Sequence, residues 1–126
     1  MRLICFAILM IIASSCKQSA VENKLSGCDS LQINFNDKSV ATTERSAISK
    51  LAKFLDGKKT EKFKCGYDGK LLFFKKNALV LDVDFKYTQT DCMHFLYTLG
   101  NELISTKLNG EAADLLESLQ KGRLWY

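Results

Sequence analysis

Asp82, Asp84 and His94 are the residues of this chain whose types could carry acid–base chemistry. The two aspartates are two positions apart, so on a strand they share one face, and paired carboxylates can transfer protons or bind calcium. Four nearby lysines favour ordinary cross-strand ion pairs instead. His94 is the single histidine, and the sequence flags no nucleophile or orienting carboxylate beside it. We therefore expect ion-paired aspartates and a packed or surface histidine, and no enzyme activity.

Cys16 follows a segment with the marks of a secretory signal peptide. Arg2 gives it a positive start, Leu3 to Ile12 is an apolar run, and Ala13-Ser14-Ser15 are small residues. The run is about half the roughly 20 apolar residues that span a bilayer. With a cysteine directly after the small residues, the segment resembles the lipobox of bacterial lipoproteins. The resemblance implies cleavage before Cys16, a diacylglyceryl group on its sulfur, and N-acylation in most Gram-negative bacteria. An ordinary signal peptide, cut after Ser15, is the alternative.

The same resemblance implies a location in the cell. Lys17 occupies the second mature position, where enterobacterial lipoproteins of the inner membrane carry an aspartate. Two or three acyl chains hold a protein firmly on a membrane, whereas one chain binds weakly. We expect a lipid-anchored protein of the cell envelope, on the outer membrane and facing the periplasm.

Three cysteines then remain for the folded part, in a compartment that permits disulfides: Cys28, Cys65 and Cys92. We predict a Cys65–Cys92 bond, because both residues border the central sheet segments and Cys28 lies at the edge of the N-terminal segment. The closed loop of about 27 residues would contribute roughly 3–4 kcal/mol on the chain-entropy model. No C-x-x-C pair is present, so we predict no metal site and no cofactor.

Length and charge limit the organisation of the chain. Removing residues 1–15 from the 126 leaves 111 residues, which suffice for one domain and are too few for two. Residues 16–27 are mostly small or polar and predict a flexible tether, so that residues 28–126 form the domain. The formal charge of +4 comes mainly from lysine. Nucleic-acid readers favour arginine for base contacts, so we expect no nucleic-acid partner.

Hydrophobic periodicity predicts a strand and then a helix. Apolar and polar residues alternate over 31–35, which is typical of a half-buried strand. Residues 44–55 carry apolar side chains that recur every three to four positions and form one stripe of a helix, namely Ala47, Ile48, Leu51, Ala52 and Leu55. Thr42 or Thr43 can cap its start, and Gly57 can take the left-handed conformation at its end.

A strand-rich block follows. Residues 61–65 predict a strand that leads into a turn at Asp68-Gly69, a strong hairpin signal. Residues 70–75 and 78–85 predict a second hairpin around Lys76-Asn77.

The last part of the chain predicts another hairpin and a helix. Residues 93–99 and 102–108 have the composition of strands, and Gly100-Asn101 suits the turn between them. A helix over 92–107 is the alternative, with a cost of about 1 kcal/mol for glycine in its middle. Asn109-Gly110 then opens a helix with a leucine stripe. The predicted order is β-α-β-β-β-β-β-α, an α+β fold with a mostly antiparallel sheet of about five or six strands and two helices on one face.

The central hairpin predicts an interaction surface. If Lys75 pairs with Ala78, one face lies under the helices and carries Leu72, Phe74, Leu79 and Leu81. Leu71, Phe73 and Val80 lie on the other face together with Asp82 and Asp84. An apolar patch rimmed by charge is typical of a partner site, although Trp125 could cover it. A shift of one residue in the pairing would exchange the two faces.

The chain as a whole resembles the small uncharacterised lipoproteins of Bacteroidetes. The resemblance rests on Lys64-Cys65-Gly66-Tyr67-Asp68-Gly69-Lys70-Leu71 and on Asp91-Cys92-Met93-His94-Phe95, and it implies no particular activity. We expect a membrane-anchored, non-catalytic binding module whose partner is an envelope protein or glycan. The alternatives are a periplasmic hydrolase inhibitor, an enzyme acting on envelope glycan or peptide through Asp82, Asp84 or His94, and a structural envelope component.

Overall fold

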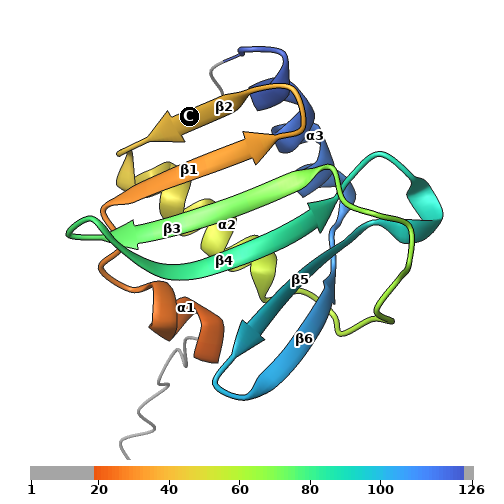
Figure 1. The fold of residues 1–126 in the computed structure, drawn as a ribbon, viewed down its shortest axis with the longest axis horizontal. Helices are drawn as coiled ribbons and strands as arrows, with labels where there is room; N and C mark the ends of the chain where they lie inside the picture. Colours follow the sequence, from red (N-terminus) through yellow and green to blue (C-terminus); the bar gives the residue numbers. More distant parts are fainter. Residues whose placement is uncertain (1–18, 124–126) are drawn as a thin grey trace, which may run out of the picture.

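The computed structural model describes residues 19–123 (Figure 1). Within these residues the chain forms three α-helices and one six-stranded sheet. The predicted signal peptide, Cys16 and Trp125 lie outside the described residues, so the structure bears on none of them.

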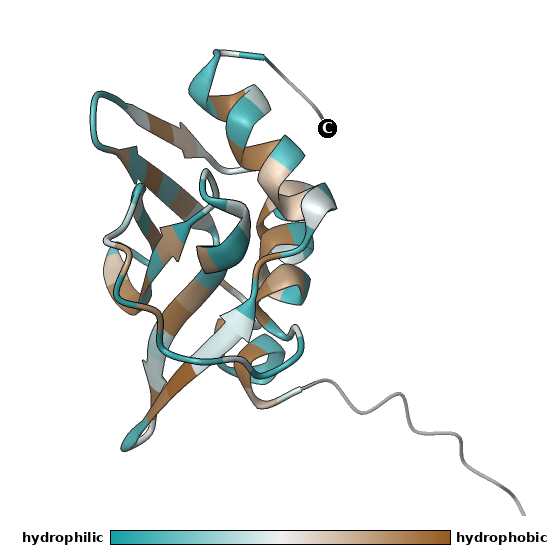
Figure 2. Ribbon diagram, turned by 90° about the vertical axis from the view of Figure 1, so that its right-hand side faces the viewer, coloured by the Kyte–Doolittle hydropathy of each residue, from teal (hydrophilic) through white to brown (hydrophobic). Residues whose placement is uncertain are grey.

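Every strand of the sheet is antiparallel to its neighbours, and the spatial order is β2-β1-β3-β4-β5-β6. All three helices lie on one side of the sheet (Figure 2). The predicted α+β fold is therefore confirmed. The elements in chain order are α1 (Ala20–Leu25), β1 (Ser30–Phe35), β2 (Ser39–Thr42), α2 (Arg45–Leu55), β3 (Gly69–Lys75), β4 (Ala78–Lys86), the short 3₁₀ turn η1 (Thr90–Cys92), β5 (His94–Leu99), β6 (Glu102–Lys107) and α3 (Gly110–Gln120).

The hydrophobic core lies between the sheet and the helices. Alternate residues of each central strand point into it, so Leu31 and Ile33 of β1 belong to the same buried cluster as Phe85 of β4 and Phe95 of β5. The predicted stripe of α2 supplies the other side, including Leu51 and Leu55. Full burial of such a side chain stabilises the fold by about 1.5–3 kcal/mol, so this layer holds the sheet and helices together.

The end of α2 is fixed by the sheet. The last carbonyl groups of a helix lack partners within it. Here the Leu55 carbonyl oxygen accepts hydrogen bonds from Tyr97 Oη (3.0 Å) and Thr106 Oγ1 (2.9 Å). Gly57 follows, but not for the predicted left-handed turn: a Cβ at this position would lie 2.7 Å from the Lys107 carbonyl oxygen. A glycine is required because the backbone passes too close to the end of β6 to leave room for a side chain.

The predicted tether over 16–27 is wrong from residue 19 onward. Ser19 Oγ accepts a hydrogen bond from Glu22 N–H (3.2 Å) and caps α1. Val21 and Leu25 are four residues apart, so they share one face of α1, and both are buried in the core. Two buried apolar residues in a six-residue helix are too few for a periodic signal, which explains why composition suggested a tether.

One predicted strand is absent from the structure, and one strand that was not predicted is present. Residues 61–65 form no strand, and Lys59 makes an isolated bridge to Thr106. Instead, β2 pairs with β1 as a four-residue strand at the edge of the sheet. Its sequence Ser-Val-Ala-Thr is too short to show clear alternation.

Both other predicted hairpins are confirmed. Lys75 pairs with Ala78, and Lys76 and Asn77 have φ of 50° and 66°, which is the left-handed turn geometry that hairpins favour. Leu99 pairs with Glu102 around Gly100-Asn101, so the helix alternative over 92–107 is wrong.

Candidate functional site

A β-bulge in the central hairpin decides which side chains face outward. Phe73 pairs with Leu81 and Phe74 with Leu79, so Val80 has no partner on β3. A bulge places one extra residue on one strand and shifts the pairing beyond it. The faces on β3 are therefore the reverse of those predicted.

Leu71 and Phe73 are consequently not on an open surface, as predicted, but fully buried at 0 % exposure beneath the helices. Val80 is half-buried and packs against the core, so it does not lie on the outer face either. Leu72 and Phe74, predicted to lie under the helices, point to the opposite side. The predicted patch is on the correct hairpin, but Leu72 and Phe74 of β3 belong to it in place of Leu71 and Phe73.

The face of the sheet opposite the helices carries partly exposed apolar side chains from four strands. Leu79 and Leu103 are the most exposed, at 54 % and 45 %. Strand alternation places the others on the same face. We call this surface the open face: its apolar side chains are Leu72, Phe74, Leu79, Leu96 and Leu103, and its central charged side chains are Lys70, Asp82 and Asp84.

The charged group of the open face is an ion-paired triad. Lys70 Nζ lies 3.1 Å from Asp82 Oδ2 and 3.2 Å from Asp84 Oδ1. Its hydrogen bond to Asp82 raises the pKa of Lys70, and Asp84 adds to this effect. The two aspartates lie on the predicted face, and Lys70 holds them as the predicted ion pairs.

One side of the open face is bordered by a segment that we call the strap, residues 59–68 (Figure 1). Ser105 ties it to β6: Thr60 N–H donates to the Ser105 carbonyl oxygen (3.0 Å), and Ser105 Oγ donates to that of Glu61 (2.8 Å). The disulfide between Cys65 and Cys92 fastens its far end, as predicted. The strap therefore sets the limit of the exposed surface on β5 and β6.

His94 lies beneath the strap and is completely buried. Its Nδ1 donates to the Cys92 carbonyl oxygen (2.6 Å), and its ring meets those of Phe63 and Tyr67 at centroid distances of 5.2 and 5.6 Å. Nε2 has no hydrogen-bond partner within the described part of the chain. Because the ring is sealed from solvent, it packs under the strap and does not face a substrate.

Asp68 was predicted as a turn residue but instead clamps the strap to the end of β4. Its carboxylate accepts hydrogen bonds from the backbone N–H groups of Tyr87 (2.8 Å) and Thr88 (3.1 Å) and from Thr88 Oγ1, and Lys86 Nζ lies 3.3 Å away. Burial raises the pKa of Asp68, but these hydrogen bonds outweigh burial and bring it below its ordinary value. Gly69 follows because a Cβ there would lie 2.1 Å from the Asn34 carbonyl oxygen.

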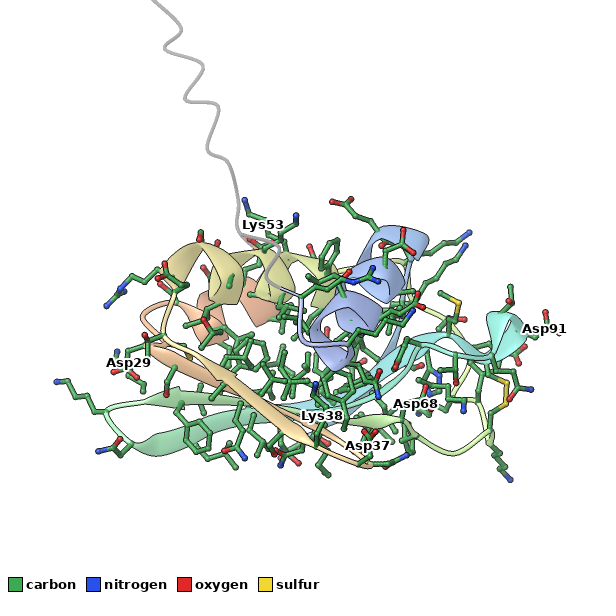
Figure 3. All side chains as sticks on the ribbon, turned by 90° about the horizontal axis from the view of Figure 1, so that it is seen from above. Asp29, Asp37, Lys38, Lys53, Asp68 and Asp91 are labelled. Carbon is green, nitrogen blue, oxygen red and sulfur yellow. A yellow bond between two sulfur atoms is a disulfide. The ribbon has the colours of Figure 1, made fainter. Side chains whose placement is uncertain are left out.

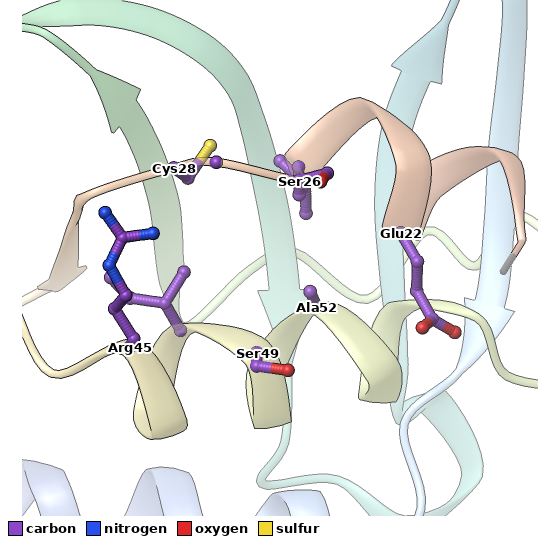
Figure 4. A pocket seen from close by; sticks show the side chains of 9 residues that line it. Glu22, Ser26, Cys28, Arg45, Ser49 and Ala52 are labelled. Carbon is purple, nitrogen blue, oxygen red and sulfur yellow. The ribbon is translucent and has the colours of Figure 1, made fainter.

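A cleft of about 210 Å³ lies between α1 and α2 (Figure 4). Arg45 and Cys28 line one end and Glu22 the other. Cys28 is the unpaired cysteine of residues 19–123, and its thiol is buried. Burial raises its pKa, with a smaller contribution from Asp29, so the thiol stays protonated and unreactive.

Residues 19–123 contain neither a cluster of metal ligands nor a membrane-spanning helix. Within residues 19–123, no three histidine, cysteine, aspartate or glutamate side chains gather closely enough to hold a metal ion. No helix in that range is long and apolar enough to cross a membrane.

Comparison of the chain with protein-family models, with curated proteins and with solved structures found no match. The function is therefore inferred from the residues of this chain.

Proposed function

We propose that this protein is a lipid-anchored, non-catalytic binding module that holds an envelope protein on the open face of its sheet. The anchor is the acylated Cys16 implied by the signal-peptide pattern. Ser19, three residues after Cys16, is the N-cap of α1.

The observation that carries the proposal is the one-sided architecture of the domain. All three helices lie on one side of the sheet, and the other side leaves Leu79 and Leu103 about half exposed. Apolar side chains from four adjacent strands of one sheet form a broad surface, unlike the scattered apolar residues of an ordinary exterior. The Lys70–Asp82–Asp84 triad offers charged groups for polar contacts, which would fix the orientation of a partner on this surface.

The chemistry of the open face favours a protein over a glycan. Its exposed apolar side chains are mainly leucines, which pack well against apolar side chains of a protein partner. Tyr67 is the exposed large aromatic residue of the described chain, and it stands at the border of the face beside His94. Phe74 is the aromatic residue of the open face itself, and it pairs with Leu79 near the hairpin turn, away from Tyr67, so the two rings do not form one stacking platform for sugar rings.

The enzyme alternative has little support in the positions of its candidate residues. Asp82 and Asp84 share Lys70 as an ion partner, so both carboxylates are already engaged within the sheet. His94 is buried under the strap, out of reach of a soluble substrate.

Paired charge insertions test the proposal. The mature chain with Cys16→Ser, which removes the lipidation site, is immobilised and exposed to detergent-solubilised envelope proteins. We expect saturable capture of a discrete partner, lost in the Leu79→Asp/Leu103→Asp variant because each new carboxylate would lose its hydration in the interface.

The matched control is Ser46→Asp/Ser49→Asp, which adds the same charge to exposed positions of α2. Retention of the partner by this control supports the open face as the binding surface. Equal loss in both variants, or no saturable partner for the folded wild-type chain, would count against the proposal.

A further inference from the structure

Helices α2 and α3 carry charges of opposite sign. Between its end residues Glu44 and Asp56, α2 has three cations, Arg45, Lys50 and Lys53, and no acidic residue, and exposed Lys58 follows Asp56. α3 has three acidic residues and no cation. It starts beside α2, where Lys50 Nζ lies 3.8 Å from Glu111 Oε1, and it ends at the β1–β2 turn, where Gln120 contacts Asp37. α1 lies on the other flank of α2 (Figure 1).

The cations near α1 lack local partners. Lys24 of α1 is exposed, as are Arg45, Lys53 and Lys58. Among residues 19–123, none of these four is in an ion pair. We call them the basic surface. Figure 3 shows Lys53 on the helical side of the molecule, whereas Asp37 and Asp68 lie on the sheet side.

The basic surface is close to the proposed point of anchorage. Three peptide units separate Cys16 from Ser19, so the lipidated residue is at most about 11 Å from the start of α1. Glu22 and Ala52 line the same cleft, which places the start of α1 beside the second half of α2, near Lys53. Electrostatic attraction to a membrane extends over about 8–10 Å at physiological salt. The link is therefore short enough to hold the cations within that range.

We propose that the basic surface lies against anionic phospholipid headgroups and holds the open face away from the bilayer. This inference rests on the proposed lipid anchor at Cys16. Clustered lysines and arginines next to an anchor are attracted to anionic lipid, and an anchor together with a basic patch binds more firmly than one signal alone. Because the helices and the open face lie on opposite sides of the sheet, this contact leaves the open face available to a partner.

Lysine footprinting on the lipidated chain tests this orientation. The full chain is produced in a host that processes lipoproteins and is reconstituted into two kinds of vesicle. One contains phosphatidylglycerol and phosphatidylethanolamine, and the other contains neutral phosphatidylcholine. A membrane-impermeant acylating reagent is added, and the modification of each lysine is measured by mass spectrometry.

We expect Lys24, Lys53 and Lys58 to react at least threefold more slowly on the anionic vesicles, with the difference removed by 0.5 M salt. Lys38, Lys62 and Lys64 are the internal controls, because they are exposed loop residues without ion pairs among the described residues. Their rates should not depend on the lipid. Lys38 is in the β1–β2 turn beside Gly122, at the end of α3 away from the Lys50–Glu111 contact.

Two negative outcomes are distinguishable. If the chain floats with both vesicles but all six lysines react alike, the anchor holds and the proposed orientation is wrong. If the chain does not float and mass spectrometry finds an unmodified Cys16, both the anchor and the orientation are overturned.

Discussion

Tyr97 shows how one side chain joins the two layers of the domain. Its hydroxyl donates to the Leu55 carbonyl oxygen at the end of α2, and the ring is buried in the core. Burial, assisted by the negative charge of Asp56, raises the pKa of Tyr97 to about 12. The neutral phenol is therefore the form that the folded state prefers.

Tyr97→Phe is expected to lower the free energy of unfolding by about 1 kcal/mol near pH 8, since one net hydrogen bond is lost. In the wild type, the unfolded state releases the phenolic proton at lower pH than the folded state. Stability should therefore fall between pH 10 and 12, by about 2 kcal/mol from this group. Urea unfolding of both chains across this range measures the effect. Identical pH profiles would contradict the assignment.

Asp68 predicts the opposite pH dependence. Its folded pKa is below its ordinary value, so its contribution is complete above about pH 4 and disappears as the pH falls through the folded pKa. Asp68→Asn should lower stability by about 1 kcal/mol at pH 7, because hydrogen bonds to a charged acceptor are weakened. It should also flatten the acid limb of the stability curve. Unfolding measured from pH 2 to 7 would disprove this role if the variant kept the wild-type acid limb.

At the scale of elements, the strap is expected to depend on its disulfide. The Cys65–Cys92 bond closes a loop with a sequence separation of 27, which corresponds to roughly 3–4 kcal/mol of unfolded-state entropy. Cys65→Ser/Cys92→Ser should lower the free energy of unfolding by about that amount and speed amide exchange in the strap before other segments. Cys28→Ser is the control and should leave exchange in the strap unchanged. A strap that exchanges as slowly without the bond would show that Ser105 and Asp68 suffice.

Leu71 and Leu72 form a matched pair that tests the bulge. Leu71→Ala should cost about 2–5 kcal/mol, because it leaves a cavity in the core, whereas Leu72→Ala on the open face should cost below about 1 kcal/mol. Denaturant unfolding of the two variants gives the comparison directly. Equal losses would mean that the faces of β3 are not those described.

The sequence predicted the elements whose signals are long or chemically specific. α2 has five apolar residues at helical spacing, and both confirmed hairpins have turn residues that accept a left-handed backbone. The Cys65–Cys92 pairing followed from the positions of its two cysteines. Elements with weak local signals were missed: α1 has one pair of apolar residues, and β2 has four residues and lies at the edge of the sheet.

The candidate site was predicted less well than the fold, for a physical reason. One unpaired residue, Val80, reverses the faces on β3 relative to a regular pairing, and Leu-Leu-Phe-Phe is apolar on both faces, so its pattern could not reveal the reversal. Residues 61–65 read as a strand because their composition is similar to one, yet tertiary bonds to Ser105 hold them as a strap. Asp82 and Asp84 were placed correctly because β4 alternates clearly beyond the bulge.

At the scale of the whole molecule, the two sides of the sheet differ in chemistry. The helical side combines the core with the basic surface, and the other side presents leucines around an ion-paired triad. Anchorage through a short link beside α1 would turn the helical side toward the lipid. The open face would then be turned toward a protein partner. The proposed function depends most on the second of these contacts.

Site-specific photo-crosslinking in cells tests that contact most directly. A photoreactive benzoylphenylalanine replaces Leu79 on the open face or Ser46 on α2 in the lipidated chain, and irradiated cells are analysed for adducts. The account predicts a discrete protein adduct from position 79 and none from position 46. A correctly disulfide-bonded chain that gives no protein adduct from position 79, or equal adducts from both positions, would contradict it.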